Sequence, residues 1–360
     1  MTDANAAQES PDSYQRNVAR GLDRAFDDPT TEELSIDLER DRLVVFSDHH
    51  KGARDGADDF WRCERAYHGA LGHYLEAGHR LLVLGDVEEL WECTPQSVIG
   101  AYRETLALES RFHAEGRYVR FWGNHDDQWR YESQVAKHLH PVFPGLRVHE
   151  ALKLRIAMGG EPLGLIFLAH GHQGTAESDR FSWLSRLVVR YLWRPLQRRL
   201  NIASTTPAQD YELRQRHDAA MFAWARSHPE RPVLIAGHTH RPIFGTSRPL
   251  PEERRSAAEV ARELDEARAA GAGTETLARL RAELEFLEAE PRRGGPPRLP
   301  IDPPCYFNTG CCSFGDGDVT GIEIAHGRIR LVRWPDDAGD PVPKVLVEDE
   351  LEAILRAVGS

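Results

Sequence analysis

Residues 81–86 carry the sequence LLVLGD, four apolar residues followed by glycine and aspartate. An uninterrupted apolar run of this length is typical of a strand that is buried on both faces of a sheet. Gly85 allows the chain to turn sharply after the strand. Asp86 then stands at the carboxyl end of the strand, where open α/β sheets place their ligand sites. An aspartate here could equally cap the next helix, and this stretch alone does not separate the two interpretations.

The same arrangement recurs along the chain. Apolar runs at 42–46, 118–122, 163–169 and 232–236 each lead into polar residues, and amphipathic stretches at 58–77 and 95–114 separate the first three strands. Alternation of strand and helix predicts an α/β fold with a parallel sheet, whose strand ends meet in one crevice. The polar residues that would meet there are Asp48, His50, Asp86, Asn124, His125, His170, His238 and His240.

The composition limits the class of protein. The chain has 360 residues, 41% of them hydrophobic, which suffices for one large domain with insertions or for two domains. The net charge of −12 argues against a nucleic-acid partner, because binding along nucleic acid needs a basic surface. A nuclease is therefore disfavoured.

The five cysteines and the amino terminus indicate a cytoplasmic protein. The cysteines are odd in number and scattered, with no C-x-x-C pair, so neither a disulfide framework nor a zinc ribbon is expected. Residues 1–12 are polar, without the pattern of a secretion signal, and we expect them to be disordered. The chain has no run of about 18 apolar residues, the length that spans a membrane.

The residues at the strand ends predict a metal site. Imidazole and carboxylate groups suit borderline divalent ions, with manganese the first choice and iron or zinc as alternatives. The number of candidate ligands is enough for two ions, with Asp86 between them. Two ions about 3.5–4 Å apart stabilise both the attacking and the leaving oxygen of a phosphoryl transfer and lower the pKa of a water that bridges them. A hydrolase of phosphate esters follows, although each motif taken singly is weak evidence.

The ordered motifs resemble those of the calcineurin-like metallophosphoesterase superfamily. They are D-x-H at 48–50, GD-x-x-E at 85–89, GNHD at 123–126, HGH at 170–172 and GHTH at 237–240. Asn308, Thr309 and Gly310 resemble the superfamily's late strand. The resemblance implies a four-layer αββα sandwich of two sheets with helices outside, covering residues 13–360.

The resemblance also implies a role for each residue. One ion would be held by Asp48, His50 and His240, the other by Asn124, His170 and His238, and Asp86 would bridge them. His125 would protonate the leaving oxygen, and Asp126 would orient His125. Glu89 stands where many members have aspartate, and its implied role is a supporting one.

Two insertions interrupt the expected domain. Residues 174–230 are predicted to form a helical cap, and residues 251–300 a helical hairpin followed by a Pro/Gly-rich linker. The motif GDVEELW at 85–91 and the helical insertion are similar to those of the UDP-2,3-diacylglucosamine hydrolases, which cleave a lipid-linked pyrophosphate. This chain departs from them in having His125 where they typically carry arginine, in its length and in its hairpin.

The predicted cap combines arginines with aromatic residues. We expect Trp183, Arg186 and Arg190 to contact an anionic small phosphate-ester substrate, with the aromatic face on a base or an acyl chain. A peripheral contact with a membrane surface and a helix that merely packs on the body remain alternatives. The hairpin is expected to serve an interaction such as homodimerisation, or to be a solvated element without a specific role.

Three functions remain open from the sequence. The favoured one is a phosphodiesterase in which a hydroxide bridging two metal ions attacks phosphorus, because a lid with aromatics suggests a grip on both ester arms. The alternatives are a pyrophosphate hydrolase of the UDP-2,3-diacylglucosamine type and a non-catalytic binding scaffold on the same fold.

Overall fold

The computed structural model divides the chain into two units. One comprises Met1–Ser247 with Ile301–Ser360, and the other Arg248–Pro300. The structure describes residues 11–55, 58–174, 207–245, 257–269, 277, 303–315, 317–336 and 339–359. The described part of the smaller unit contains helix α9 (Ala257–Ala269), within the predicted hairpin, and the remainder of that hairpin lies outside the described residues apart from Leu277.

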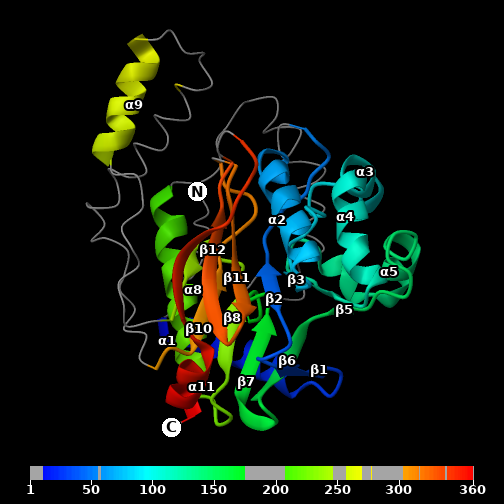
Figure 1. Cartoon of the computed structure of the whole chain (residues 1–360), viewed down its shortest axis with the longest axis vertical. Helices are drawn as coiled ribbons and strands as arrows, with labels where there is room; N and C mark the ends of the chain where they lie inside the picture. The colour runs from blue at the N-terminus through cyan, green and yellow to red at the C-terminus, as the bar shows by residue number, and fades with distance from the viewer. Residues whose placement is uncertain are drawn as a thin grey trace, which may run out of the picture. The chain divides into compact units, whose positions relative to one another are not determined.

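The described strands of the larger unit form two mixed sheets (Figure 1). The seven-stranded sheet has the order β13-β12-β11-β2-β3-β4-β5, and the six-stranded sheet has the order β1-β6-β7-β8-β10-β9. The first sheet consists of β2 (Leu43–Phe46), β3 (Arg80–Leu84), β4 (Tyr118–Phe121), β5 (Val148–His149), β11 (Val319–Ala325), β12 (Arg328–Trp334) and β13 (Lys344–Glu350). The second consists of β1 (Glu32–Asp37), β6 (Ala151–Met158), β7 (Glu161–Ala169), β8 (Val233–Ala236), β9 (Pro242–Ile243) and β10 (Tyr306–Thr309).

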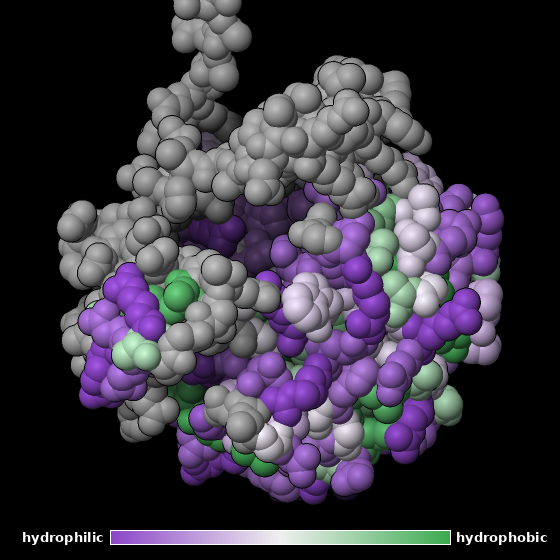
Figure 2. Space-filling model, turned by 90° about the horizontal axis from the view of Figure 1, so that it is seen from above, coloured by the Kyte–Doolittle hydropathy of each residue, from purple (hydrophilic) through white to green (hydrophobic). Residues whose placement is uncertain are grey.

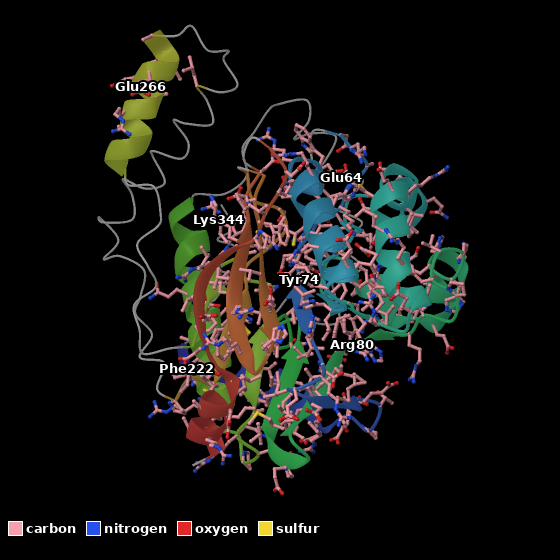
Figure 3. The ribbon with its side chains drawn as sticks, in the orientation of Figure 1. Glu64, Tyr74, Arg80, Phe222, Glu266 and Lys344 are labelled. Carbon is pink, nitrogen blue, oxygen red and sulfur yellow. The ribbon has the colours of Figure 1, made fainter. Side chains whose placement is uncertain are left out.

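Helices pack on the sheets from opposite sides (Figure 1). The helices that contact the six-stranded sheet include α1 (Pro11–Asp27), α8 (Pro207–Ser227) and α11 (Leu351–Gly359). On the other side lie α2 (Glu64–Glu76), α3 (Pro95–Ala101), α4 (Arg103–Ala114) and α5 (Glu132–His138), with the short 3-10 helices η1 (Phe60–Arg62) and η2 (Asp127–Arg130). Tyr74 of α2 and Phe222 of α8, one from each of these two groups of helices, are buried (Figure 3). The fold is therefore an α/β sandwich with two sheets.

The predicted strand at residues 81–84 is buried on both faces. Leu82 and Leu84 belong to the core that reaches the six-stranded sheet, whereas Leu81 and Val83 belong to the core under α2 and α4. Strand β3 runs parallel to β2 on one side and to β4 on the other. Because parallel neighbours end at the same edge of a sheet, the three loops that follow these strands start side by side.

Several expected boundaries differ in the structure. The helix expected at 95–114 is interrupted at buried Tyr102, whose hydroxyl donates to Asp58 Oδ2 at 2.7 Å. Residues 347–350 belong to strand β13, where Glu348 pairs with Arg328 and Arg330 of β12, and the last helix begins after them. The first helix begins at Pro11, inside the tail expected to be disordered, while residues 1–10 lie outside the described part.

Helix α8 falls within the stretch 174–230 that was expected to form a cap. It packs on α1 and on strands β8 and β10, so this part of the stretch is a layer of the body. The basic and aromatic residues of the predicted cap, including Trp183, Arg186 and Arg190, lie outside the described residues.

The described surface is mostly hydrophilic in the view from above (Figure 2). In the part of the chain that the structure describes, no helix combines the length and the hydropathy needed to cross a membrane.

Candidate metal centre

Loops from both sheets supply the candidate ligands. Strands β2, β3 and β4 of the seven-stranded sheet lead into Asp48 and His50, into Asp86, and into Asn124 and His125. Strands β7 and β8 of the six-stranded sheet lead into His170 and into His238 and His240. The sandwich brings these loops together. Candidate ligands that follow strands of one sheet therefore lie within contact distance of candidate ligands that follow strands of the other.

The backbone at the site adopts a conformation that side chains other than glycine rarely take. Among the described residues, eight non-glycine residues have positive φ, and five of them are the candidate ligands Asp48, His50, Asp86, His238 and His240. Such a conformation costs of order 1–3 kcal/mol per residue and is retained where surrounding structure imposes it, frequently at functional sites. The loops thus hold these five side chains in directions that turns with ordinary negative φ would not give them.

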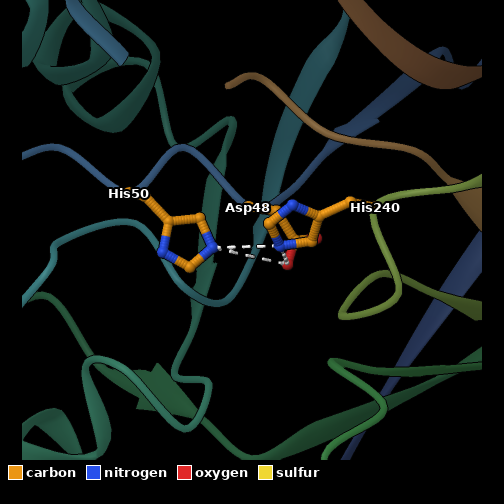
Figure 4. A group of neighbouring side chains, drawn as sticks. All are labelled: Asp48, His50 and His240. Carbon is orange, nitrogen blue, oxygen red and sulfur yellow. Dashed lines mark hydrogen bonds and ion pairs between the residues drawn. The ribbon is translucent and has the colours of Figure 1, made fainter. Parts of the chain in front are cut away.

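The first ligand group consists of Asp48, His50 and His240 (Figure 4). The Nε2 atom of His240 lies 3.3 Å from Asp48 Oδ1 and 3.1 Å from His50 Nε2. One ligand atom from each of the three residues lies within 4.8 Å of the others, which is close enough for all three to contact one ion.

The second ligand group consists of Asp86, His170 and His238, with the same limit of 4.8 Å between ligand atoms. His170 Nε2 lies 3.1 Å from Asp86 Oδ2 and 3.9 Å from Asp48 Oδ1, and His50 Nε2 lies 3.8 Å from Asp86 Oδ2. The two groups are therefore neighbours, and Asp86 lies beside residues of both. A third grouping, His50 with Asp86 and His125, overlaps them.

The hydrogen bonds on the far side of two imidazoles fit a metal site. His170 Nδ1 lies 2.8 Å from the carbonyl oxygen of Leu84, which can only accept, so Nδ1 carries a proton, and Nε2 is the nitrogen that would offer a lone pair once the ring is neutral. His50 Nδ1 lies 3.1 Å from Glu89 Oε2, which leaves its Nε2 available in the same way. Both Nε2 atoms point to the carboxylates of Asp48 and Asp86. These buried Asp and His groupings could hold a metal ion.

The electrostatics of the site favour positive charge beside its carboxylates. Burial alone would lower the pKa of His170, but the Asp86 and Asp48 carboxylates raise it to about 9. Burial alone would raise the pKa of Asp86, but His170 and His125 hold it well below the usual range. The carboxylates thus stay ionised although they are buried, and require positive charge beside them.

His125 stands at the edge of the ligand groups. Its backbone N–H donates to Asp86 Oδ1 at 2.8 Å, and its Nδ1 donates to Glu89 Oε2 at 2.7 Å. Its ring stacks on Trp91 with centroids 4.3 Å apart and 15° between the planes. Asn124, the preceding residue, is buried in the same loop. The backbone bond, the Glu89 contact and the stack together fix the orientation of this imidazole.

Asp126, which was expected to orient His125, contacts the backbone of two loops of the site. Its carboxylate accepts from the backbone N–H groups of Gly123 at 2.6 Å and Val87 at 2.9 Å, and so ties the loop after β4 to the loop after β3. Glu89 also lies beside His125, with Oε2 2.7 Å from Nδ1. The GD-x-x-E spacing was the available signal, since it places Glu89 three residues beyond Asp86.

The cysteines that follow β10, Cys311 and Cys312, are buried. Burial raises the pKa of Cys311 to about 12 and that of Cys312 well above its usual range. The backbone N–H of Cys312 contacts the carbonyl oxygens of Ser47 and Asp48, both at 3.2 Å. The backbone of Cys312 thus contacts the first ligand loop, and thiolate ligation by either cysteine is not favoured.

Models of known protein families were compared with the chain and none matches, and no curated protein matches it either. A function must therefore be inferred from the arrangement of the site itself.

A buried ion pair anchors the loop after β2. Lys51, which follows His50, lies 2.6 Å through Nζ from Glu109 Oε1, and both side chains are fully buried. We expect Lys51→Met to lower the free energy of unfolding by about 3–5 kcal/mol, because it leaves Glu109 buried without its cation. Urea unfolding measures the loss. The control Arg356→Met removes an exposed i,i+4 pair and should change stability by only about 0.3–0.5 kcal/mol. Equal effects of the two variants would contradict this account.

Gly123 has no side chain at a point where Asp86 lies very close to its backbone. A Cβ atom at Gly123 would overlap Asp86 Oδ1 and lie 2.7 Å from the Asp86 backbone nitrogen, closer than real Cβ contacts. We expect Gly123→Ala to displace Asp86 and weaken manganese binding at least about tenfold, as losses around metal ligands do. Gly72→Ala is the matched control, because a Cβ there meets nothing within 4 Å and alanine suits helix α2. Manganese titration followed by electron paramagnetic resonance checks both, and unchanged affinity in Gly123→Ala would refute the steric argument.

Proposed function

We propose that this protein is a phosphoesterase that uses two divalent metal ions, with phosphodiesters as its preferred substrates. The observation that carries the proposal is the pair of adjacent ligand groups, Asp48 with His50 and His240, and Asp86 with His170 and His238. Two sites so close together, built from carboxylate and imidazole, match the requirements of phosphoryl transfer by two ions. The α/β sandwich with two sheets supports a place in the calcineurin-like metallophosphoesterase superfamily, with its four-layer architecture.

Each ion would have its own ligands and would share Asp86. Asp48, His50 and His240 would hold the first, and His170 and His238 with the nearby Asn124 the second. Manganese is the first choice, with iron or zinc as alternatives, and the bound ions would activate water and offset the charge of the phosphoryl oxygens.

His125 is the group placed to move a proton. Glu89 accepts the hydrogen bond of Nδ1, so Nε2 is the nitrogen that delivers a proton to the leaving oxygen. Trp91 restricts rotation of the ring through the stack. A fixed proton donor beside a metal pair is useful for ester cleavage because an alkoxide or phenoxide leaves more readily when it is protonated.

The first test is a substrate panel on one protein sample. Metal-depleted protein should be inactive, and manganese should restore hydrolysis of bis(p-nitrophenyl) phosphate above that of p-nitrophenyl phosphate. Cyclic AMP and a UDP-diacylglucosamine analogue complete the panel, and preference for the latter would favour the pyrophosphate hydrolase. An absence of turnover with manganese, iron and zinc in the presence of bound metal would favour the binding scaffold instead.

A further inference from the structure

Helix α8 carries two adjacent buried polar residues, His217 and Asp218, which have no part in the chemistry proposed above. The helix packs on strands β8 and β10 of the six-stranded sheet. That sheet supplies three of the candidate ligands, His170, His238 and His240, and the two residues of α8 contact the loops that carry them.

His217 holds the loop that follows β7. Its Nε2 lies 2.6 Å from the carbonyl oxygen of Gly171, the residue after His170, and its Nδ1 lies 2.7 Å from the hydroxyl of Tyr14 in α1. Because a carbonyl oxygen only accepts, Nε2 carries the proton and Nδ1 accepts from the tyrosine. Burial lowers the pKa of His217 to about 4, which agrees with a neutral ring in this tautomer. The ring also lies edge-on to His238, with centroids 5.0 Å apart.

Asp218 holds the loop that follows β8. Its Oδ1 accepts from the hydroxyls of Thr239 at 2.9 Å and Tyr306 at 2.8 Å, and its Oδ2 lies 3.4 Å from Arg241 Nη1. Thr239 and Arg241 flank His240 on either side in the sequence. A single carboxylate thus fixes both neighbours of a candidate ligand, and Tyr306 ties the carboxylate to strand β10.

We propose that His217 and Asp218 are positioning residues of the metal centre, which set the ligand loops of the six-stranded sheet at the distance that two metal ions require. The inference rests on the proposed function for the identity of the ligands. The proposal explains a contact between the two sheets, in which His170 Nε2 lies 3.1 Å from Asp86 Oδ2. Groups that orient metal ligands typically contribute 10–100-fold to metal affinity, so removing them should be measurable without any assay of turnover.

The experiment compares manganese affinity in His217→Phe and His217→Gln, followed by the electron paramagnetic resonance signal of free manganese. Phenylalanine fills the space but makes neither hydrogen bond, and we expect manganese to bind about 10–100-fold more weakly. Glutamine offers one amide donor and one carbonyl acceptor in place of the two ring nitrogens, and we expect affinity close to that of the wild type. The matched control is His228→Phe, just beyond the end of α8, where the ring packs on Phe26 and Trp224.

Wild-type affinity in His217→Phe, or equal weakening in the phenylalanine and glutamine variants, would overturn the proposal. If His217→Phe does not fold, the manganese affinities of Tyr14→Phe and Asp218→Asn test the proposal instead. Each of these variants removes one hydrogen-bonding or charged group and keeps most of the side chain's volume. Weaker manganese binding in either supports the proposal, and wild-type affinity in both overturns it. A wild-type protein that binds manganese but cleaves no phosphate ester would contradict the proposed function alone, because affinity still decides the positioning roles.

Discussion

Asp86→Asn is expected to abolish nearly all phosphodiester hydrolysis, with kcat at least about a thousandfold lower. Asp86 lies beside both ligand groups, 3.1 Å from His170 Nε2 and 3.8 Å from His50 Nε2. Asparagine keeps the size of the side chain but removes its charge and one of its two anionic ligand oxygens. Charge stabilisation by a metal ion contributes several kcal/mol, and about 4 kcal/mol corresponds to a thousandfold in rate. The measurement is kcat on bis(p-nitrophenyl) phosphate, with manganese bound per chain determined on the same sample.

The control for this variant is Asp27→Asn, because Asp27 is an exposed aspartate at the end of α1. It should keep wild-type turnover and metal content. If Asp86→Asn retained both manganese ions and more than a tenth of the activity, Asp86 would not be the shared ligand.

His125→Ala is expected to keep both manganese ions and to lower kcat by about 10²–10⁴, the usual range for loss of a general acid. The loss should depend on the leaving group. A p-nitrophenolate leaves with little help from a proton, so diesters that release phenol should suffer the larger loss. Glu89→Gln should reproduce part of the effect, because Glu89 Oε2 accepts from His125 Nδ1. Turnover of a matched pair of aryl diesters measures this dependence.

The structure also allows a different outcome for His125, since its ring nitrogen groups with His50 and Asp86 within 4.8 Å. If His125→Ala lost a metal ion, His125 would be a ligand and not the proton donor. His326→Asn is the control, because His326 is exposed and asparagine tolerates its positive φ of 54°.

The sheet and the place of the candidate site could be predicted from the sequence, because both follow from the order of residue types along the chain. A run such as residues 81–84 can be buried on both faces only inside a layered fold, and Leu82 and Val83 do face different cores. Parallel pairing of β2, β3 and β4 then places Asp48 and Asp86 at one edge. The members of the two ligand groups are residues that the sequence indicated, and Asn124 is buried in the same loop as His125.

Other features depend on directions and partners that sequence spacing does not specify. The spacing did not specify that the Asp126 carboxylate accepts from backbone N–H groups, or that Glu89, three residues beyond Asp86, reaches His125. Strand β1 was not predicted, since its short polar sequence buries little and depends on parallel pairing with β6. His217 and Asp218 carried no motif, because their contacts join α8 to loops far away in the chain.

The most direct test of the central claim is anomalous scattering from crystals of the manganese-loaded protein. We predict two peaks about 3.5–4 Å apart, the separation of paired ions in phosphoryl-transfer enzymes. One peak should lie among Asp48, His50 and His240, and the other among the second ligand group, with Asp86 between them. A single peak, or peaks elsewhere in the molecule, would contradict the assignment of a two-metal centre to these strand ends.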